Sequence, residues 1–202
     1  MKLYYSPGAC SLAVHIALRE LGLPFEGVAV DLANHQLQDG TNYFDISPRG
    51  YVPVLELDNG ARHSEASALL QYVADQDPEQ ALIGRVGNER RLAVTEALTF
   101  VSTELHKVFS PWLWHKETAD STRTAVREKL ATRFAELDKV FAHRDFIAGE
   151  YSVADAYAFA ILNWVNFLSI SISPYPNLKA YLQRVANRPA VQAALRAEGL
   201  VK

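Results

Sequence analysis

The spacing of apolar residues in the N-terminal part of the chain predicts a β-α-β unit. A short strand at Lys2–Tyr5 ends at the turn Ser6-Pro7-Gly8, and the mostly apolar stretch from 11 to 21 is typical of a buried helix. Residues 25–30 form the next strand candidate. We therefore expect two parallel strands joined by a helix.

A hairpin and a further helix should follow. The apolar strand expected over 51–57 is joined to a short return strand at 61–63 by Asp58-Asn59-Gly60, a strong hairpin signal. Ser64 is placed to cap a helix over 65–75. The stretch between the second strand and this hairpin is polar and carries no clear pattern.

From about Asn88 onward the pattern is helical. Apolar residues recur at steps of three and four along one long amphipathic helix, which Pro111 should kink or break because proline removes a hydrogen bond and crowds the preceding turn. Ser152-Val153-Ala154-Asp155 has the form of a capping box before a strongly apolar helix. The other helices are expected at 122–142, 156–168, 178–185 and 190–197. We thus expect an α/β domain at 1–79 and an all-α domain at 86–202.

Charge and composition exclude several classes of protein. The formal net charge is −3 and no basic run occurs, so a nucleic-acid or membrane surface partner is not expected. The apolar segment 153–172 is interrupted by polar residues, and one cysteine without a secretory signal favours the cytoplasm. Zinc-ligand spacing, a dinucleotide fingerprint and a phosphate loop are missing, so neither a metal nor a nucleotide cofactor is expected.

Cys10 is the first candidate for chemistry. It lies where the first loop becomes the first helix, and the positive end of a helix stabilises a thiolate, so we expect a pKa below the usual value of about 8.5. The alternative is a buried, inert cysteine. The neighbouring Ser11 is either an ordinary N-cap or a hydroxyl that donates to a bound sulfur.

Two further segments each allow a structural and a functional interpretation. Val52-Pro53 lies inside a strand, where a cis bond would turn the backbone of Val52 towards a ligand; the alternative is a trans proline in an edge strand. Ser64-Glu65-Ala66-Ser67 opens a helix whose N–H groups could hold a carboxylate, or is simply a capped helix start.

The long helix also carries a polar face opposite its apolar stripe. Thr99, Thr103 and His106 align at steps of four and three, with Ser102, Glu104 and Lys107 beside them. A solvated helix face is the ordinary explanation of such a pattern, and a ligand-facing surface is the alternative.

Taken together, four motifs closely resemble the bacterial beta-class glutathione transferases, over essentially the whole chain. They are residues 2–12 (KLYYSPGACSL), 46–55 (ISPRGYVPVL), 152–157 (SVADAY) and 198–200 (EGL). The resemblance implies the glutathione transferase fold, in which a thioredoxin-like α/β N-terminal domain with a cis Val52-Pro53 bond precedes an all-α C-terminal domain. It also implies a two-fold dimer.

The resemblance also implies a glutathione site, with glutathione as co-substrate and no other cofactor. Cys10 would face the glutathione sulfur and could form a mixed disulfide with it, and the backbone of Val52 would pair with the cysteinyl part. Glu65 and Ala66 would hold the γ-glutamyl end. The helix side of the cleft would carry Ser102, Thr103, Glu104, His106 and Lys107, with Thr103 and Glu104 reaching the ligand of the partner subunit. Cys10, Ser11 and His106 are the catalytic candidates.

This sequence departs from the family pattern at four positions. His35 occupies a position where the family often has lysine, and it would contact the glycyl carboxylate of glutathione. Tyr51 occupies a position where glutamine is frequent, and Thr99 one where some members have asparagine. Val14 replaces a frequent proline without structural consequence.

The implied reaction is attack of the glutathione thiolate on a small hydrophobic electrophile, with Phe109, Trp112 and Trp114 as candidates for the electrophile's surface. A thiol transferase or peroxidase that cycles through a Cys10–glutathione disulfide is a rival, and both activities can coexist. A non-catalytic binding module on the same fold is the other alternative.

Overall fold

The N-terminal domain contains a five-stranded mixed sheet. The computed structural model describes residues 1–202, and its strands are β1 (Lys2–Tyr5), β2 (Glu26–Asp31), β3 (Gln36–Leu37), β4 (Val54–Glu56) and β5 (Arg62–Ser64). The order is β3-β2-β1-β4-β5, with β1 parallel to β2 and the other neighbours antiparallel. The predicted β-α-β unit and the hairpin are therefore confirmed.

The two faces of the sheet are covered differently because side chains alternate along a strand. Leu3 and Leu55 point into the main core, towards α1 (Ser11–Glu20) and α2 (Ala66–Ala74). Tyr4 and Val54 point to the opposite face, where a small core of six residues includes Tyr43 of a 3₁₀ turn at Tyr43–Asp45. This is the thioredoxin-like arrangement that the resemblance implies, and the bond between Val52 and Pro53 is cis.

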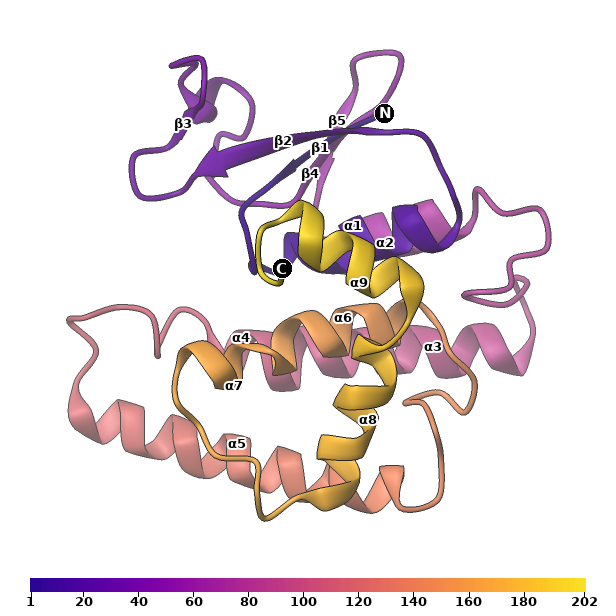
Figure 1. Cartoon of the computed structure of the whole chain (residues 1–202), viewed down its shortest axis with the longest axis vertical. Helices are drawn as coiled ribbons and strands as arrows, with labels where there is room; N and C mark the ends of the chain where they lie inside the picture. Colours follow the sequence, from indigo (N-terminus) through magenta and orange to yellow (C-terminus); the bar gives the residue numbers. More distant parts are fainter.

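Most of the remainder of the chain is helical and lies below the sheet and its helices in Figure 1, whereas the last helix, α9 (Pro189–Ala197), lies beside α1. The main core of 45 buried residues is continuous between the two domains, because α1 packs on α6 and on α9. The helices are α3 (Glu89–Phe100), α4 (Lys107–Phe109), α5 (Asp120–Phe141), α6 (Val153–Leu162), α7 (Trp164–Phe167), α8 (Pro176–Ala186) and α9 (Pro189–Ala197). No helix is long and apolar enough to span a bilayer.

The long helix expected from Asn88 is interrupted before its proline. A π-helical segment at Val101–His106 joins α3 to α4, and the backbone leaves the helix at Ser110 beside the cis Pro111. Each π turn accommodates more residues than an α turn, so it shifts the side chains that follow around the axis. Ser102, His106 and Lys107 thereby come to line a cavity.

The predicted capping box is present. The Ser152 hydroxyl accepts a hydrogen bond from the N–H of Ala154, while the Asp155 carboxylate accepts from Ser152 N and from the Tyr181 hydroxyl. Burial raises the pKa of Asp155 to about 6, although several hydrogen bonds oppose this shift. The apolar helix behind the box is shorter than expected, because Asn163 separates α6 from α7.

One predicted cap is wrong. Ser64 is the last residue of β5, and Glu65 occupies the N-cap position of α2 without any side-chain capping bond. Pairing of β5 with β4 continues through Ser64, which opposes Val54, and this holds Ser64 in the sheet. The unassigned polar stretch contains β3 and the 3₁₀ turn.

Candidate functional site

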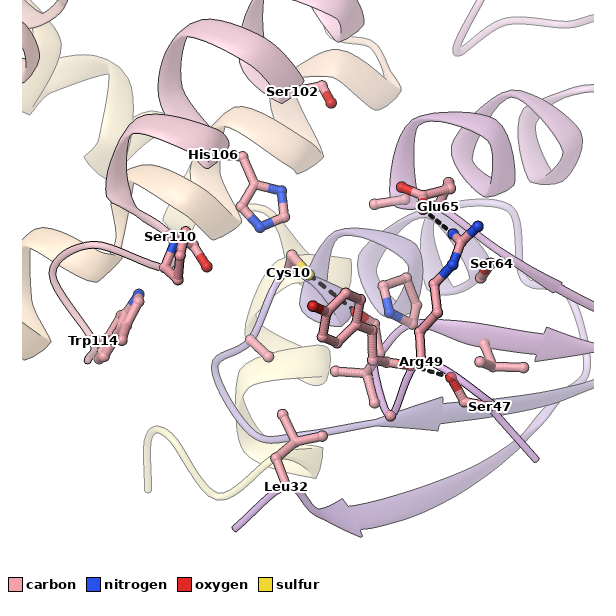
Figure 2. A pocket seen from close by; sticks show the side chains of 18 of the residues that line it. Cys10, Leu32, Ser47, Arg49, Ser64, Glu65, Ser102, His106, Ser110 and Trp114 are labelled. Carbon is pink, nitrogen blue, oxygen red and sulfur yellow. Dashed lines mark hydrogen bonds and ion pairs between the residues drawn. The ribbon is translucent and has the colours of Figure 1, made fainter. Parts of the chain in front are cut away.

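A cavity of about 1000 Å³ lies between the two domains. One wall comes from three segments of the N-terminal domain, which are the loops at 7–10 and 46–53 and the junction of β5 with α2 at 62–67. The facing wall comes from the π-helical segment, the loop that follows α4, and α7. Figure 2 shows Cys10 between these walls, with Arg49 and Trp114 on opposite sides of it.

Cys10 lies on the floor of the cavity as the N-cap residue of α1. Its Sγ donates a hydrogen bond to the carbonyl oxygen of Val52 at 3.3 Å, an interaction that requires the protonated thiol. Burial raises the pKa of Cys10 to about 12; the positive charge of Lys107 opposes this shift but is the weaker effect. The expectation of a lowered pKa is therefore wrong for the unliganded protein, because desolvation of the thiolate outweighs the helix terminus.

Ser11 forms hydrogen bonds with the loop that precedes Cys10. Its buried hydroxyl accepts a hydrogen bond from Ser6 N at 3.2 Å and donates to Ser6 O at 3.3 Å. It is neither the N-cap nor part of the cavity wall. The Ser11 side chain thus stabilises the turn that precedes Cys10.

The same loop is held by the C-terminal part of the chain. The N–H of Gly8 donates to Glu198 at 2.9 Å, and its carbonyl accepts from the indole of Trp164 at 2.8 Å. Glu198 also meets His15 Nδ1 at 2.8 Å, while Arg19 donates to His15 Nε2 at 2.9 Å. Because Nε2 accepts, Nδ1 carries the proton and donates to Glu198.

Val52 lines the cavity, and its carbonyl oxygen accepts from the Cys10 thiol. The carbonyl of the preceding Tyr51 accepts hydrogen bonds from the hydroxyls of Tyr43 at 2.9 Å and Ser47 at 3.0 Å. These two bonds hold the loop that presents the carbonyl of Val52 to Cys10. The cis peptide at Pro53 stands where the resemblance implies it.

Glu65 and Ala66 lie at the start of α2, and both line the cavity. Glu65 has a positive φ of 72°, and its carboxylate accepts a hydrogen bond from Arg49 Nη1 at 3.0 Å. Ala66 is buried at the first helical position, where backbone N–H groups have no partner inside the helix.

His106 lies on the opposite wall of the cavity. Its Nδ1 is 2.7 Å from the Tyr157 hydroxyl, and its ring packs edge-on against Trp164 and Tyr157. Burial, together with the nearby charge of Lys107, lowers the pKa of His106 to about 4. The imidazole is therefore neutral at neutral pH.

Three other residues of the predicted polar face lie outside the cavity of this chain. The hydroxyls of Thr99 and Thr103 donate to carbonyls one turn earlier, at 2.9 Å and 3.0 Å. Glu104 forms ion pairs with Arg133 at 3.1 Å and Lys129 at 3.5 Å on α5. Of that face, only Ser102, His106 and Lys107 line the cavity of this chain.

His35 lies at the edge of the cavity beside the N-terminal loops. Its ring packs against Phe44 at a centroid distance of 4.4 Å, with the two rings tilted by 35°, and covers Gly50. Gly50 has a φ of 67°, and a Cβ there would lie 2.7 Å from the imidazole. The glycine thus permits both the turn and the close approach of His35.

The aromatic end of the cavity differs from the prediction. Trp114 lines it, but Phe109 is fully buried against Phe134 and Trp164, and Trp112 lies outside the wall. Trp164 and Phe167 of α7 line it instead. Trp164 and Phe167 were not predicted from the sequence because they stand in a strongly apolar segment that is typical of a buried core, although their spacing of three places them on one helix face.

Comparisons with known proteins agree with this geometry. Family models described as the N-terminal and the C-terminal domain of glutathione S-transferase match residues 8–76 and 100–189. The chain is 40% identical to the glutathione S-transferase GstA of Escherichia coli, over 99% of this chain and all of that one.

Two solved structures are similar over the full length. A beta-class glutathione S-transferase of Sphingomonas chungbukensis is 45% identical, with a TM-score of 0.94 and coverage of 100% of both chains. A sphingomonad glutathione S-transferase complexed with glutathione is 44% identical, with a TM-score of 0.93 and the same coverage. No group of three or more potential metal ligands occurs in the structure.

Proposed function

We propose that this chain, which belongs to the glutathione S-transferase family and is an enzyme of the bacterial beta class, uses the cavity at Cys10 to join glutathione to a small hydrophobic electrophile. One observation carries the proposal. The cavity has a polar half at Glu65 and His35 and an aromatic half at Trp114 and Trp164, with Cys10 and His106 between them. A peptide thiol fits the first half and an apolar electrophile the second.

In this arrangement glutathione extends along the N-terminal loops. Its cysteinyl part pairs with the backbone of Val52, which places the sulfur beside Cys10. The γ-glutamyl end lies at Glu65 and Ala66, and the glycyl carboxylate lies near His35. The relative complexed with glutathione supports the choice of ligand.

The chain's own residues then favour the thiolate of glutathione. The Tyr157 hydroxyl lies 2.7 Å from Nδ1 of neutral His106. In the tautomer that carries its proton on Nε2, Nδ1 accepts from this hydroxyl and the Nε2–H can donate to a sulfur in the cavity. Lys107 adds a positive charge at the same wall. The thiol proton leaves to water, the sulfur–carbon bond forms, and the leaving group departs with the electron pair of its bond to carbon.

Cys10 favours a second activity, reduction of mixed disulfides. Cys10, once it has lost its proton, attacks the glutathione sulfur of the mixed disulfide and releases the other thiol as its thiolate. A second glutathione thiolate then attacks the glutathione sulfur of the Cys10 disulfide, which releases oxidised glutathione and Cys10, and Cys10 takes up a proton again. The position of this single cysteine on the cavity floor supports the idea.

We further propose a cytoplasmic homodimer in which Thr99, Thr103 and Glu104 lie near the ligand of the partner subunit. Their exposed or partly exposed positions on one helix face outside the cavity are compatible with this role. Residues 1–79 would then bind glutathione, while residues 86–202 supply the electrophile's wall. No metal is required.

The test separates the two activities in one pair of variants. Cys10→Ala should lose glutathione-dependent disulfide reduction almost completely, yet retain much of the conjugation of 1-chloro-2,4-dinitrobenzene, because glutathione supplies its own sulfur to the second reaction. Trp114→Ala should show the reverse pattern. Equal loss of both activities in Cys10→Ala would contradict the division of roles.

A further inference from the structure

A second cavity, of about 380 Å³, shares no lining residue with the cavity at Cys10. Its walls come from the end of β1, from α1, from the loop between α1 and β2, from β2 itself and from the end of α9. The two helices lie side by side in Figure 1. Small-molecule sites have volumes of roughly 300–1000 Å³, so this cavity is large enough for a small ligand.

Gly27 of β2 opens this second cavity. Leu3 is its partner in the parallel register, so position 27 faces the helices as Leu3 does. A Cβ at Gly27 would lie 3.3 Å from the ring of Tyr5 and 3.9 Å from the ring of Phe25. The φ of Gly27 is not positive, so the backbone does not require glycine here. Glycine inside a strand is typical of a close approach by a ligand or by another backbone.

Arg19 supplies a positive charge to the wall, and no acidic residue lines this cavity. Its Nε donates to His15 Nε2 at 2.9 Å, and its guanidinium carbon lies 5.8 Å from the centre of the Phe25 ring. Neither Nη group of Arg19 has an acceptor in the chain, whereas Arg188 donates twice to Glu20. The Nη edge of Arg19 can therefore donate two parallel hydrogen bonds to a carboxylate.

Three aromatic rings surround the space beside this guanidinium. Tyr5 and Phe25 both pack against His15, at centroid distances of 5.5 Å and 5.3 Å. Burial and the negative charge of Glu198 raise the pKa of Tyr5, while Arg19 opposes the shift, so Tyr5 keeps its proton at neutral pH. Its hydroxyl has no partner within the chain and can donate to a ligand. The walls thus suit a flat apolar group that carries an acceptor.

We propose that this second cavity binds a small aromatic carboxylate, of the size of a substituted benzoate. The ring of the ligand lies over Gly27, between Tyr5 and Phe25, and its carboxylate accepts from both Nη groups of Arg19. One guanidinium matches the charge of a monoanion, and its bond to His15 stays in place because that bond uses Nε. The site is separate from the cavity at Cys10, so this inference does not rest on the proposed function.

The experiment is a titration of the full chain with 4-fluorobenzoate, followed by fluorine NMR. We expect saturable binding with a dissociation constant of about 0.1–1 mM, which is ordinary for a ligand of this size. Arg19→Gln should weaken binding at least about tenfold, because it removes the charge-assisted hydrogen bonds. Gly27→Val should have a similar effect, because its side chain fills the space while Arg19 remains. The uncharged 4-fluorobenzamide should bind the wild type at least about tenfold more weakly.

Arg127→Gln is the control, because it removes an exposed arginine of α5 outside both cavities. This variant should bind 4-fluorobenzoate as the wild type does. Trp114→Ala should do so as well, since Trp114 belongs to the first cavity. A thermal melt shows that each variant is folded, and if either Arg19→Gln or Gly27→Val does not fold, the other decides.

Three results would overturn the inference. The first is no saturable binding of 4-fluorobenzoate to the wild type up to about 10 mM. The second is unchanged binding in a folded Arg19→Gln or Gly27→Val variant. The third is loss of binding in Trp114→Ala, which would place the probe in the cavity at Cys10.

Discussion

The thiol of Cys10 donates to the carbonyl oxygen of Val52 at 3.3 Å, across 42 positions of sequence. This contact joins the start of α1 to the loop before the cis proline, which are the two parts of the N-terminal domain that meet the sulfur in the proposed complex. It also holds the cysteine as a thiol before any ligand binds. The protonation state of Cys10 therefore depends on a tertiary contact and on burial.

Cys10 should react slowly with iodoacetamide at neutral pH. Burial raises its pKa to about 12, so the thiol form dominates below that pH and the alkylation rate should keep rising through pH 9. The measurement is the rate constant from pH 6 to 10, followed by mass spectrometry of the single cysteine. A plateau reached below pH 8 would mean that the helix terminus, and not burial, controls the thiol.

His106 should remain neutral well below neutral pH. Its pKa is lowered to about 4, so the folded protein takes up this proton only near that pH, whereas an unfolded histidine does so near 6.5. As the pH falls from about 6.5 to 4, this group therefore favours the unfolded state, and its contribution to stability is lost.

The imidazole resonance in the NMR spectrum, assigned by its absence in His106→Gln, should show a midpoint near 4. The glutamine variant should also lose less thermal stability than the wild type between pH 6.5 and 4.5. A midpoint at 6 or above would rule out the enclosed, neutral imidazole. Comparison with the variant removes the contribution of Asp155, which titrates in the same range in both proteins.

Glu198→Ala should destabilise the protein and disturb the Cys10 loop. The change leaves the N–H of Gly8 and the Nδ1–H of His15 buried without an acceptor, which should cost about 2–4 kcal/mol of unfolding free energy. Urea denaturation measures this loss. Glu79→Ala, at a highly exposed side chain, is the control and should change stability little. Equal effects of the two changes would show that Glu198 does not support the loop.

Gly50→Ala should impair the site more than Gly60→Ala. Both positions have positive φ, so each change carries backbone strain of about 1 kcal/mol. Only the Cβ at position 50 would lie 2.7 Å from the His35 ring, whereas nothing lies within 4 Å of one at position 60. The Michaelis constant for glutathione should rise in Gly50→Ala alone. An equal rise in both variants would indicate a general effect of strain.

Local sequence patterns predicted most of the elements because those elements depend on local interactions. The period of the apolar residues placed α1, α2 and α5 to within a few residues. The capping box at Ser152 and Asp155 was predicted because both partners lie within one turn of each other. The strand at 51–57 was overestimated, because only Val54–Glu56 finds neighbours in the sheet.

The candidate site was predicted less completely than the fold. The pattern of the long helix placed His106 and Lys107 on its polar face, and the resemblance assigned them to the cleft. The pattern could not show that a π-helical segment turns these residues into the cavity while Thr99 and Thr103 remain outside it. Trp164 and Glu198, which bind the Gly8 backbone, were missed as site residues because their partner lies more than 150 positions away.

The sequence by itself determined where Cys10 stands along the chain, at the start of an apolar helix, and which polar and aromatic residues were available to it. Only the tertiary structure decided the state of that thiol. The free energy of a charge depends on all the dipoles and solvent around it, and these come from segments distant in sequence. The helix terminus favours a thiolate locally, but packing of α1 between the sheet and α6 removes the water, and Val52 supplies an acceptor for the proton.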